Sequence, residues 1–184
     1  MRPPALVRDS VIAGELCAQL QAADAPRAAG EFGRRLLGLV QYCGLCSGAY
    51  HVNALRSHLR FTGSTRAVRL SPSCVCADDG LYAVLCLSNR GQALALFDSR
   101  MHTRHDVAMA PGDLLVVPLS FRVYFGRTHA AQQDVAAAYF VALFCPCPAP
   151  EPAPVALALD AVPEELCPFA DEERACAKVK AERA

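Results

Sequence analysis

A series of short apolar runs separated by turn residues, from Arg66 to Phe144, is the feature that most constrains the fold. Runs of this length, bounded by Gly, Pro, Asn and Asp, are typical of consecutive strands. The predicted strands are residues 66–70, 81–87, 93–97, 106–109, 114–118, 122–125 and 135–144. Turns fit between them at residues 88–91 and 110–113. Regular spacing of this kind predicts a sandwich or a barrel.

The first third of the chain has a different, helical period. Asp9 or Ser10 can cap a first helix whose apolar face carries residues 12, 16, 17 and 20. A second helix can begin near Pro26 and end before Gly44. A third, shorter helical pattern covers residues 50–59. The sequence therefore predicts two or three helices ahead of the strands.

The ends of the strand region are marked by proline. Residues 145–154 alternate proline with other residues, so they cannot continue a hydrogen-bonded ladder and predict an extended linker. A polar helical pattern with acid early and base late follows beyond residue 163. We expect a helical layer at 1–62, a strand-rich core at 63–147 that forms one domain with it, and a linker with a partly disordered tail at 148–184.

Composition and charge exclude several classes of partner. The 184 residues are 53% hydrophobic, enough for a substantial core, and 18 basic residues balance 18 acidic ones. No global field therefore attracts nucleic acid or an anionic membrane. The abundance of Ala, Arg and Pro indicates a GC-rich genome, so alanine alone does not predict helix.

Targeting signals and cysteines indicate the compartment. The first residues lack the apolar segment of a signal peptide, and no stretch approaches the roughly 20 apolar residues that span a bilayer. We expect a protein of the cytosol or nucleus that is not secreted. Its ten cysteines are then reduced thiols, metal ligands or small buried hydrophobes rather than disulfides.

One spacing of cysteines suits a metal. Cys43 and Cys46 form a CxxC pair, and Cys74 and Cys76 are weak candidates for the other half of a zinc site, with His51 or His58 as further ligands. The alternatives are a redox dithiol and thiols without a metal.

Histidines group around the predicted strands. His102, His105 and Asp106 lie in a polar segment between two strands, as ligands, proton carriers or a solvated loop. His129 precedes the last long apolar strand, where it binds iron or is a polar loop residue. The sequence has no glycine-rich phosphate loop, nucleophile elbow or HExxH motif.

Residues 63–147 resemble the double-stranded β-helix of the prolyl hydroxylase type of 2-oxoglutarate- and iron-dependent dioxygenases. The matching segments are residues 63–70, the strand 81–89 ending in Leu-Ser-Asn, the strand 91–97 beginning at a glycine, and residues 107–118, where a Pro-Gly turn precedes an apolar strand. The resemblance places His129 at the family's distal iron ligand. It implies an α+β fold, a jelly-roll-like β-helix barrel with N-terminal helices packed on it.

The functional residues of that family are only partly present. An active member needs a His-x-Asp or His-x-Glu pair just before the strand at Leu81, and residues 73–80 contain no histidine, although Asp78 or Asp79 offers a carboxylate. Ala138 stands near the position of the basic residue that holds 2-oxoglutarate. The facial triad for ferrous iron is thus incomplete. The resemblance implies a remnant pocket of His129, Asp78, Asp79 and Tyr82.

These departures predict a catalytically inactive module without a cofactor. Poxviruses encode proteins that resemble this domain and bind host factors, so we expect a viral protein that acts in the host cytoplasm or nucleus. Its partner would be a host protein, such as a prolyl hydroxylase or an innate signalling component. One alternative is an active metal enzyme with ferrous iron and 2-oxoglutarate, or a cupin-like one, using His102, His105 or His129 with Asp79 or Asp106. The other is a zinc-stabilised adaptor.

Overall fold

The structure is a computed structural model of the chain. The described residues are 3–22, 29–46, 48–62, 68–72, 79–90, 92, 94–98, 103–126, 135–147 and 157–162. None of the described helices is long and apolar enough to cross a membrane.

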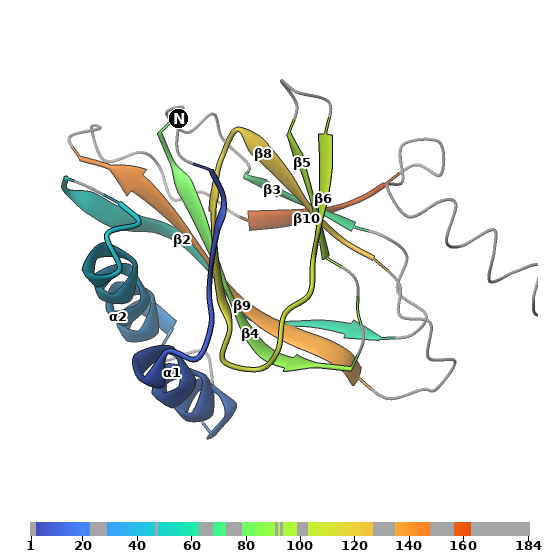
Figure 1. The fold of residues 1–184 in the computed structure, drawn as a ribbon, viewed down its shortest axis with the longest axis horizontal. Helices are drawn as coiled ribbons and strands as arrows, with labels where there is room; N and C mark the ends of the chain where they lie inside the picture. Colours follow the sequence, from blue (N-terminus) through green and yellow to red (C-terminus); the bar gives the residue numbers. More distant parts are fainter. Residues whose placement is uncertain are drawn as a thin grey trace, which may run out of the picture.

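Two helices and two antiparallel sheets make up the described part of the chain (Figure 1). The helices are α1 (Val11–Ala22) and α2 (Ala29–Tyr42). The first sheet, sheet A, contains β1 (Ala5–Val7), β7 (Leu114–Pro118), β4 (Leu81–Asn89), β9 (Val135–Pro146) and β2 (Tyr50–Thr62), in that order. The second, sheet B, contains β10 (Leu157–Ala161), β3 (Val68–Pro72), β8 (Phe121–Phe125), β5 (Leu94–Asp98) and β6 (Thr103–Val107).

The strand order shows the predicted double-stranded β-helix. Strands β2, β3 and β4 alternate between the sheets, lying in sheet A, sheet B and sheet A, and β7 to β9 repeat this alternation, while β5 and β6 both lie in sheet B. Every strand pair is antiparallel. The predicted α+β fold class, with helices packed on a β-helix barrel, is confirmed.

Two buried layers hold these elements together. One lies between the sheets and includes Val84, Val123 and Tyr139, which are fully buried. The other lies between sheet A and the two helices, where Leu36 meets residues such as Leu85. Figure 1 shows α1 and α2 on the side of sheet A that faces away from sheet B. Because side chains alternate along a strand, neighbouring residues of β4 and β9 serve different layers.

The predicted helix at residues 50–59 is wrong, because this segment is the long strand β2. It pairs with β9, but its register shifts between Val52 and Ala54 and again between Arg56 and Leu59. Each shift adds a residue to one strand and interrupts the alternation of the side chains. After the first shift, Val52 and Leu55 both pack in the layer against the helices although they are three residues apart, whereas Leu59 packs between the sheets.

The remaining elements follow the sequence closely. The side-chain hydroxyl of Ser10 accepts a hydrogen bond from the backbone N–H of Ala13 at 3.3 Å and caps α1 as predicted. The strands shift by up to three residues at an end, the largest shift being β6, predicted at 106–109 and found at Thr103–Val107. The short strands β1 and β10 were not predicted, and β10 lies within the range assigned to linker and tail.

Candidate functional site

A pocket of about 400 Å³ opens between the two sheets where their edge strands β1 and β6 face each other. We call it the inter-sheet pocket. Its lining residues come from both sheets and from the segment before β1, and are Pro3, Pro4, Leu6, Arg8, Leu96, His105, Asp106, Val107, Ala108, Leu115 and Phe121. Its size is in the range of small-molecule sites, and most of its walls are apolar with a few polar groups.

Two strand pairings bring His105 to this pocket. Strand β6 pairs with β5 so that His105 lies opposite Leu96, and β5 pairs in turn with β8, which begins at Phe121. The rings of His105 and Phe121 lie 6.4 Å apart. His105 Nε2 lies 3.3 Å from the hydroxyl oxygen of Thr103. The imidazole is therefore held between the mouth of the pocket and a neighbouring hydroxyl.

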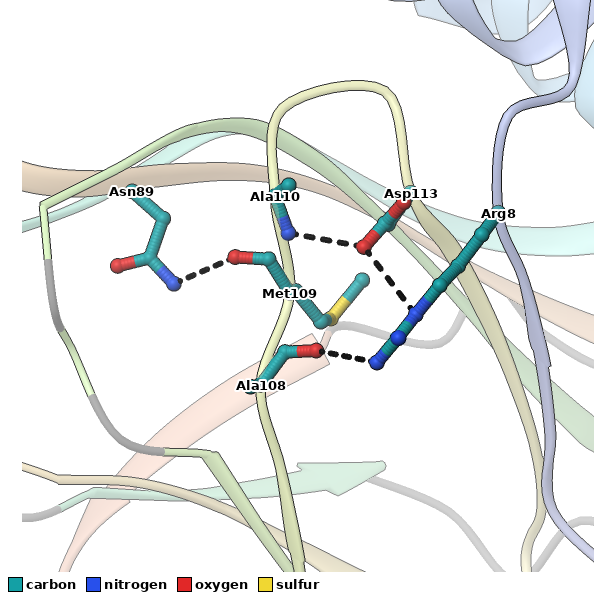
Figure 2. A network of polar contacts seen from close by, with 6 residues as sticks. All are labelled: Arg8, Asn89, Ala108, Met109, Ala110 and Asp113. Carbon is teal, nitrogen blue, oxygen red and sulfur yellow. Dashed lines mark hydrogen bonds and ion pairs between the residues drawn. The ribbon is translucent and has the colours of Figure 1, made fainter.

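Arg8 lines the pocket at the edge of sheet A, and Figure 2 shows its side chain beside Ala108 and Asp113. Its Nη2 donates a hydrogen bond to the carbonyl oxygen of Ala108 at 3.4 Å, and its Nε lies 4.0 Å from the carboxylate of Asp113. That carboxylate also accepts a hydrogen bond from the backbone N–H of Ala110 at 2.9 Å. The guanidinium thus ties the segment after β1 to the turn before β7.

The same turn is held from its other side by Asn89. The side-chain amide of Asn89 donates to the carbonyl oxygen of Met109 at 2.9 Å, as Figure 2 shows. Gly112 has a φ of 88°, a conformation that glycine adopts without strain, and the N–H of Asp113 donates to the carbonyl of Ala110 at 3.0 Å. The predicted Pro-Gly turn is therefore present, and it lies next to the pocket residue Ala108 in the chain.

The inter-sheet layer behind the pocket contains two ionisable groups that stay neutral. Burial, reinforced by the nearby Cys17 and Asp113, raises the pKa of the Cys86 thiol to about 12. Burial also raises the pKa of Tyr139, and its hydroxyl has no hydrogen-bond partner in the described part of the chain. These groups pack within the core and supply no charge to a ligand.

The described lining does not by itself hold a catalytic metal. His105 supplies one imidazole, and the carboxylate of its neighbour Asp106 accepts a hydrogen bond from Arg104 Nε at 2.7 Å. Among the residues that the structure describes, no three His, Cys, Asp or Glu side chains gather closely enough to bind a metal ion. A ferrous facial triad needs two histidines and a carboxylate. The described residues therefore do not supply the ligand set of ferrous iron, and they form a pocket with one imidazole.

The predicted remnant pocket is not the pocket found. Tyr82 is buried in the layer between the sheets, and Asp79 lies exposed before β4, where its backbone carbonyl accepts a hydrogen bond from the Tyr50 hydroxyl at 3.0 Å. Neither lines the inter-sheet pocket. His129 and Asp78 lie outside the described residues, so their positions stay predictions.

The position near which a 2-oxoglutarate clamp was expected faces the wrong side of sheet A. Ala138 lies in the layer against the helices, while its neighbours Ala137 and Tyr139 point between the sheets. The alternation of side chains along β9 accounts for this difference. A basic residue at 138 would not reach the inter-sheet pocket, so Ala138 is not the missing clamp.

The zinc candidates are only partly described. Cys46 is buried and Cys43 is half-buried, and both contact the layer between the helices and sheet A. Cys74 and Cys76, the proposed second half, lie outside the described residues. The predicted zinc site therefore stays a prediction.

Sequence reasoning missed Arg8 and Phe121 as pocket residues. Arg8 follows a strand of only three residues, which is too short to show a period. Phe121 begins β8 and reads as one more core residue. The sequence does identify His105, which is one of the possible metal ligands under the metal-enzyme alternative.

Comparison with known proteins identifies the fold. The epimerase SnoN from nogalamycin biosynthesis, described as non-heme and α-ketoglutarate dependent, has a TM-score of 0.53 at 11% identity, over 84% of this chain and 92% of SnoN. HygX from Streptomyces hygroscopicus, with nickel and 2-oxoglutarate bound, has a TM-score of 0.51 at 14% identity, over 78% and 82% of the two chains. The chain has the double-stranded β-helix fold of the 2-oxoglutarate and iron dioxygenases.

A third structure extends the match over nearly the whole chain. The non-heme monooxygenase ThoJ, in a nickel complex, has a TM-score of 0.51 at 15% identity, over 97% of this chain and 89% of ThoJ. No protein-family model matches the sequence, and no curated protein matches it either.

The prediction of no cofactor is contradicted by these neighbours. HygX has been solved with iron and with nickel and 2-oxoglutarate, and SnoN with Fe3+ and α-ketoglutarate. Proteins of this fold thus point to iron and 2-oxoglutarate rather than to an absence of ligands.

Proposed function

We propose that this chain is a binding module built on the oxygenase fold, which recognises another protein and keeps the inter-sheet pocket as a ligand site without oxygenase turnover. The observation that carries the proposal is the chemistry of the pocket lining. The lining offers one imidazole, from His105, and one carboxylate, from Asp106, which is paired with Arg104. Ligand binding needs only such a lining, whereas oxygenase chemistry needs three metal ligands in one place.

The sequence supports the same conclusion outside the described residues. The segment 73–80, where the resembling family carries its His-x-Asp pair, contains no histidine in this chain. The fold, in contrast, is complete, with both sheets and the covering helices present. A preserved scaffold with an altered site is what a protein that works by binding requires.

The partner class in this proposal is a cellular protein, such as a prolyl hydroxylase or an innate signalling component. The proposal includes a viral origin and an effect on hypoxic or innate immune signalling. A direct test is binding of the purified chain to a purified prolyl hydroxylase, measured by biolayer interferometry. Saturable binding supports this partner, and no binding at micromolar concentration overturns it.

The turnover part of the proposal is tested by an assay for succinate. The purified chain is incubated with ferrous iron, ascorbate, oxygen and 2-oxoglutarate, and succinate is quantified. We expect succinate at the level of a no-protein control, because the described pocket lacks a metal triad. A prolyl hydroxylase with its peptide substrate serves as the positive control.

A second candidate is a working iron- and 2-oxoglutarate-dependent oxygenase. The observation that favours it is that HygX, solved with nickel and 2-oxoglutarate, shares this fold. Iron would supply the oxidising chemistry in such an enzyme. Protein-dependent succinate formation would establish this candidate and overturn the binding-only proposal.

A further inference from the structure

Cys147 and His51 lie side by side at the end of the β2–β9 pair, away from the inter-sheet pocket. Cys147 Sγ is 3.4 Å from His51 Nδ1, a hydrogen-bond distance for sulfur. The backbone N–H of Cys147 donates to the carbonyl of Ala49 at 2.7 Å, and His51 pairs with Cys145 in the sheet. The backbone therefore fixes both side chains beside each other.

Cys147 differs from the other described thiols in its exposure. Cys17, Cys46, Cys86 and Cys145 are buried and Cys43 is half-buried, whereas Cys147 is exposed. Burial raises the pKa of Cys86 to about 12 and also raises the pKa of Cys17. Because the thiolate is the reacting form, these two core thiols are poor nucleophiles. Among the described cysteines, Cys147 combines access with a neighbouring base.

The two ring nitrogens of His51 lie in different surroundings. His51 Nε2 is buried and has no hydrogen-bond partner within the described ranges, whereas Nδ1 lies 3.4 Å from Cys147 Sγ. Nδ1 is therefore the nitrogen placed to accept the proton of the Cys147 thiol, which is the arrangement of a nucleophile and its base.

A cavity of about 570 Å³ between α2 and β2 reaches His51, the histidine of this pair, while Cys147 is not among its lining residues. His51 lines it together with Arg34, Tyr50 and Asn53. Arg34 is exposed, so its guanidinium offers a positive charge at the wall of the cavity. Strand β2 is also the edge of sheet A in the described fold, with a side available to peptide groups. This setting suits a small anionic molecule with peptide bonds.

We propose that Cys147 is a site of thiol–disulfide exchange with a small anionic peptide disulfide, such as glutathione disulfide. His51 Nδ1 accepts the proton of the Cys147 thiol, and the thiolate attacks one sulfur of the disulfide. The new S–S bond forms as the old one breaks, and the leaving glutathione thiolate takes the proton from His51. The products are glutathionylated Cys147 and one reduced glutathione, so no further oxidant is needed.

The first test measures the modification rate of each cysteine in the full, reduced chain. Glutathione disulfide is added, and labelling is followed by peptide mass spectrometry. We expect Cys147 to react at least about tenfold faster than Cys43, and faster in the native chain than in urea. Equal rates at the two residues, or a Cys147 rate that rises on unfolding, would overturn the proposal.

The roles of His51 and Arg34 are separated by two variants. His51→Gln should slow modification of Cys147 about tenfold or more at neutral pH while leaving Cys43 unchanged. Arg34→Gln should raise the glutathione disulfide concentration for half-maximal rate but leave the rate with the uncharged hydroxyethyl disulfide unchanged. Thermal unfolding by circular dichroism confirms that both variants are folded. If His51→Gln folds and reacts at the wild-type rate, His51 is not the base. If Arg34→Gln affects both disulfides equally, the cavity is not the recognition site.

Discussion

Sheet A and sheet B have the same number of strands in the described fold but very different surroundings. Sheet A lies between the helices and sheet B, so that β4 is buried over seven consecutive residues. Sheet B has one face toward sheet A, and its edge strand β6 contains no buried residue. The inter-sheet pocket forms where this lightly packed edge faces β1. We therefore expect sheet A to contribute most of the stability, and the inter-sheet pocket lies at the border of the two sheets.

The largest expected difference between the sheets concerns two phenylalanines. Phe140 is fully buried between sheet A and the helices, whereas Phe97 of β5 is only partly buried. Phe140→Ala should lower the free energy of unfolding by about 3–5 kcal/mol, because it leaves a cavity in a packed layer. Phe97→Ala should cost about 1 kcal/mol. Urea unfolding measures both, and equal losses would contradict the comparison.

A matched pair of glycines tests the packing of α2 on sheet A. A Cβ atom at Gly33 would lie 2.7 Å from Leu55 Cδ2, whereas one at Gly38 meets nothing within 4 Å. Gly33→Ala should destabilise by about 1 kcal/mol because Leu55 must shift. Gly38→Ala should stabilise by up to about 1 kcal/mol through helix propensity. Thermal unfolding of both variants gives the difference, and equal melting temperatures would show that α2 is loosely packed there.

Alkaline pH should weaken the layer between the sheets. Cys86 has a pKa raised from 9.0 to about 12, so above pH 9 the unfolded chain loses this proton while the folded chain keeps it. Stability contributed by the neutral thiol is therefore complete below pH 9 and declines as pH rises toward 12, by about 1 kcal/mol at pH 10. Cys86→Ala should show a shallower decline. If the stability of Cys86→Ala falls with pH as steeply as that of the wild-type chain, Cys86 does not cause the decline.

The smallest expected effect is on the strand that borders the pocket. Arg8 has a side chain that is 60% exposed and an ion-pair distance of 4.0 Å, so Arg8→Ala should cost under about 1 kcal/mol. Hydrogen exchange of the β1 amides should nevertheless accelerate, because Arg8 ties this strand to Ala108. Arg122→Ala, at an exposed position of β8, should leave β1 unchanged. Equal hydrogen exchange of the β1 amides in the two variants would show that Arg8 does not hold β1 in place.

Much of the fold is predictable from sequence because the strands of the barrel are separated by clear turns. The segment around Gly112 has the turn residues that its backbone requires, and the run beginning at Leu81 is apolar throughout because both of its faces are buried. Strand β2 was mistaken for a helix because its apolar residues recur at helical spacing: a register shift puts Val52 and Leu55 on one face, while Leu59 packs on the other. The short strands β1 and β10 gain their structure from their neighbours rather than from a local pattern.

The site is less predictable than the fold because it depends on which strand edges meet. Arg8 and His105 are nearly a hundred residues apart, and only the order of strands in the two sheets brings them to one pocket. Ala138 was assigned to the wrong face because the resemblance gives an approximate position, while one residue along a strand reverses the side chain. His129 and Asp78 stay predictions.

Formation of succinate from 2-oxoglutarate in the presence of ferrous iron distinguishes a binding module from an oxygenase. We expect none above the no-protein control, because the described pocket contains the imidazole of His105 without two further metal ligands. Sustained protein-dependent succinate formation that stops on chelation of iron would contradict this expectation, and would show that this chain is an oxygenase in function as well as in fold.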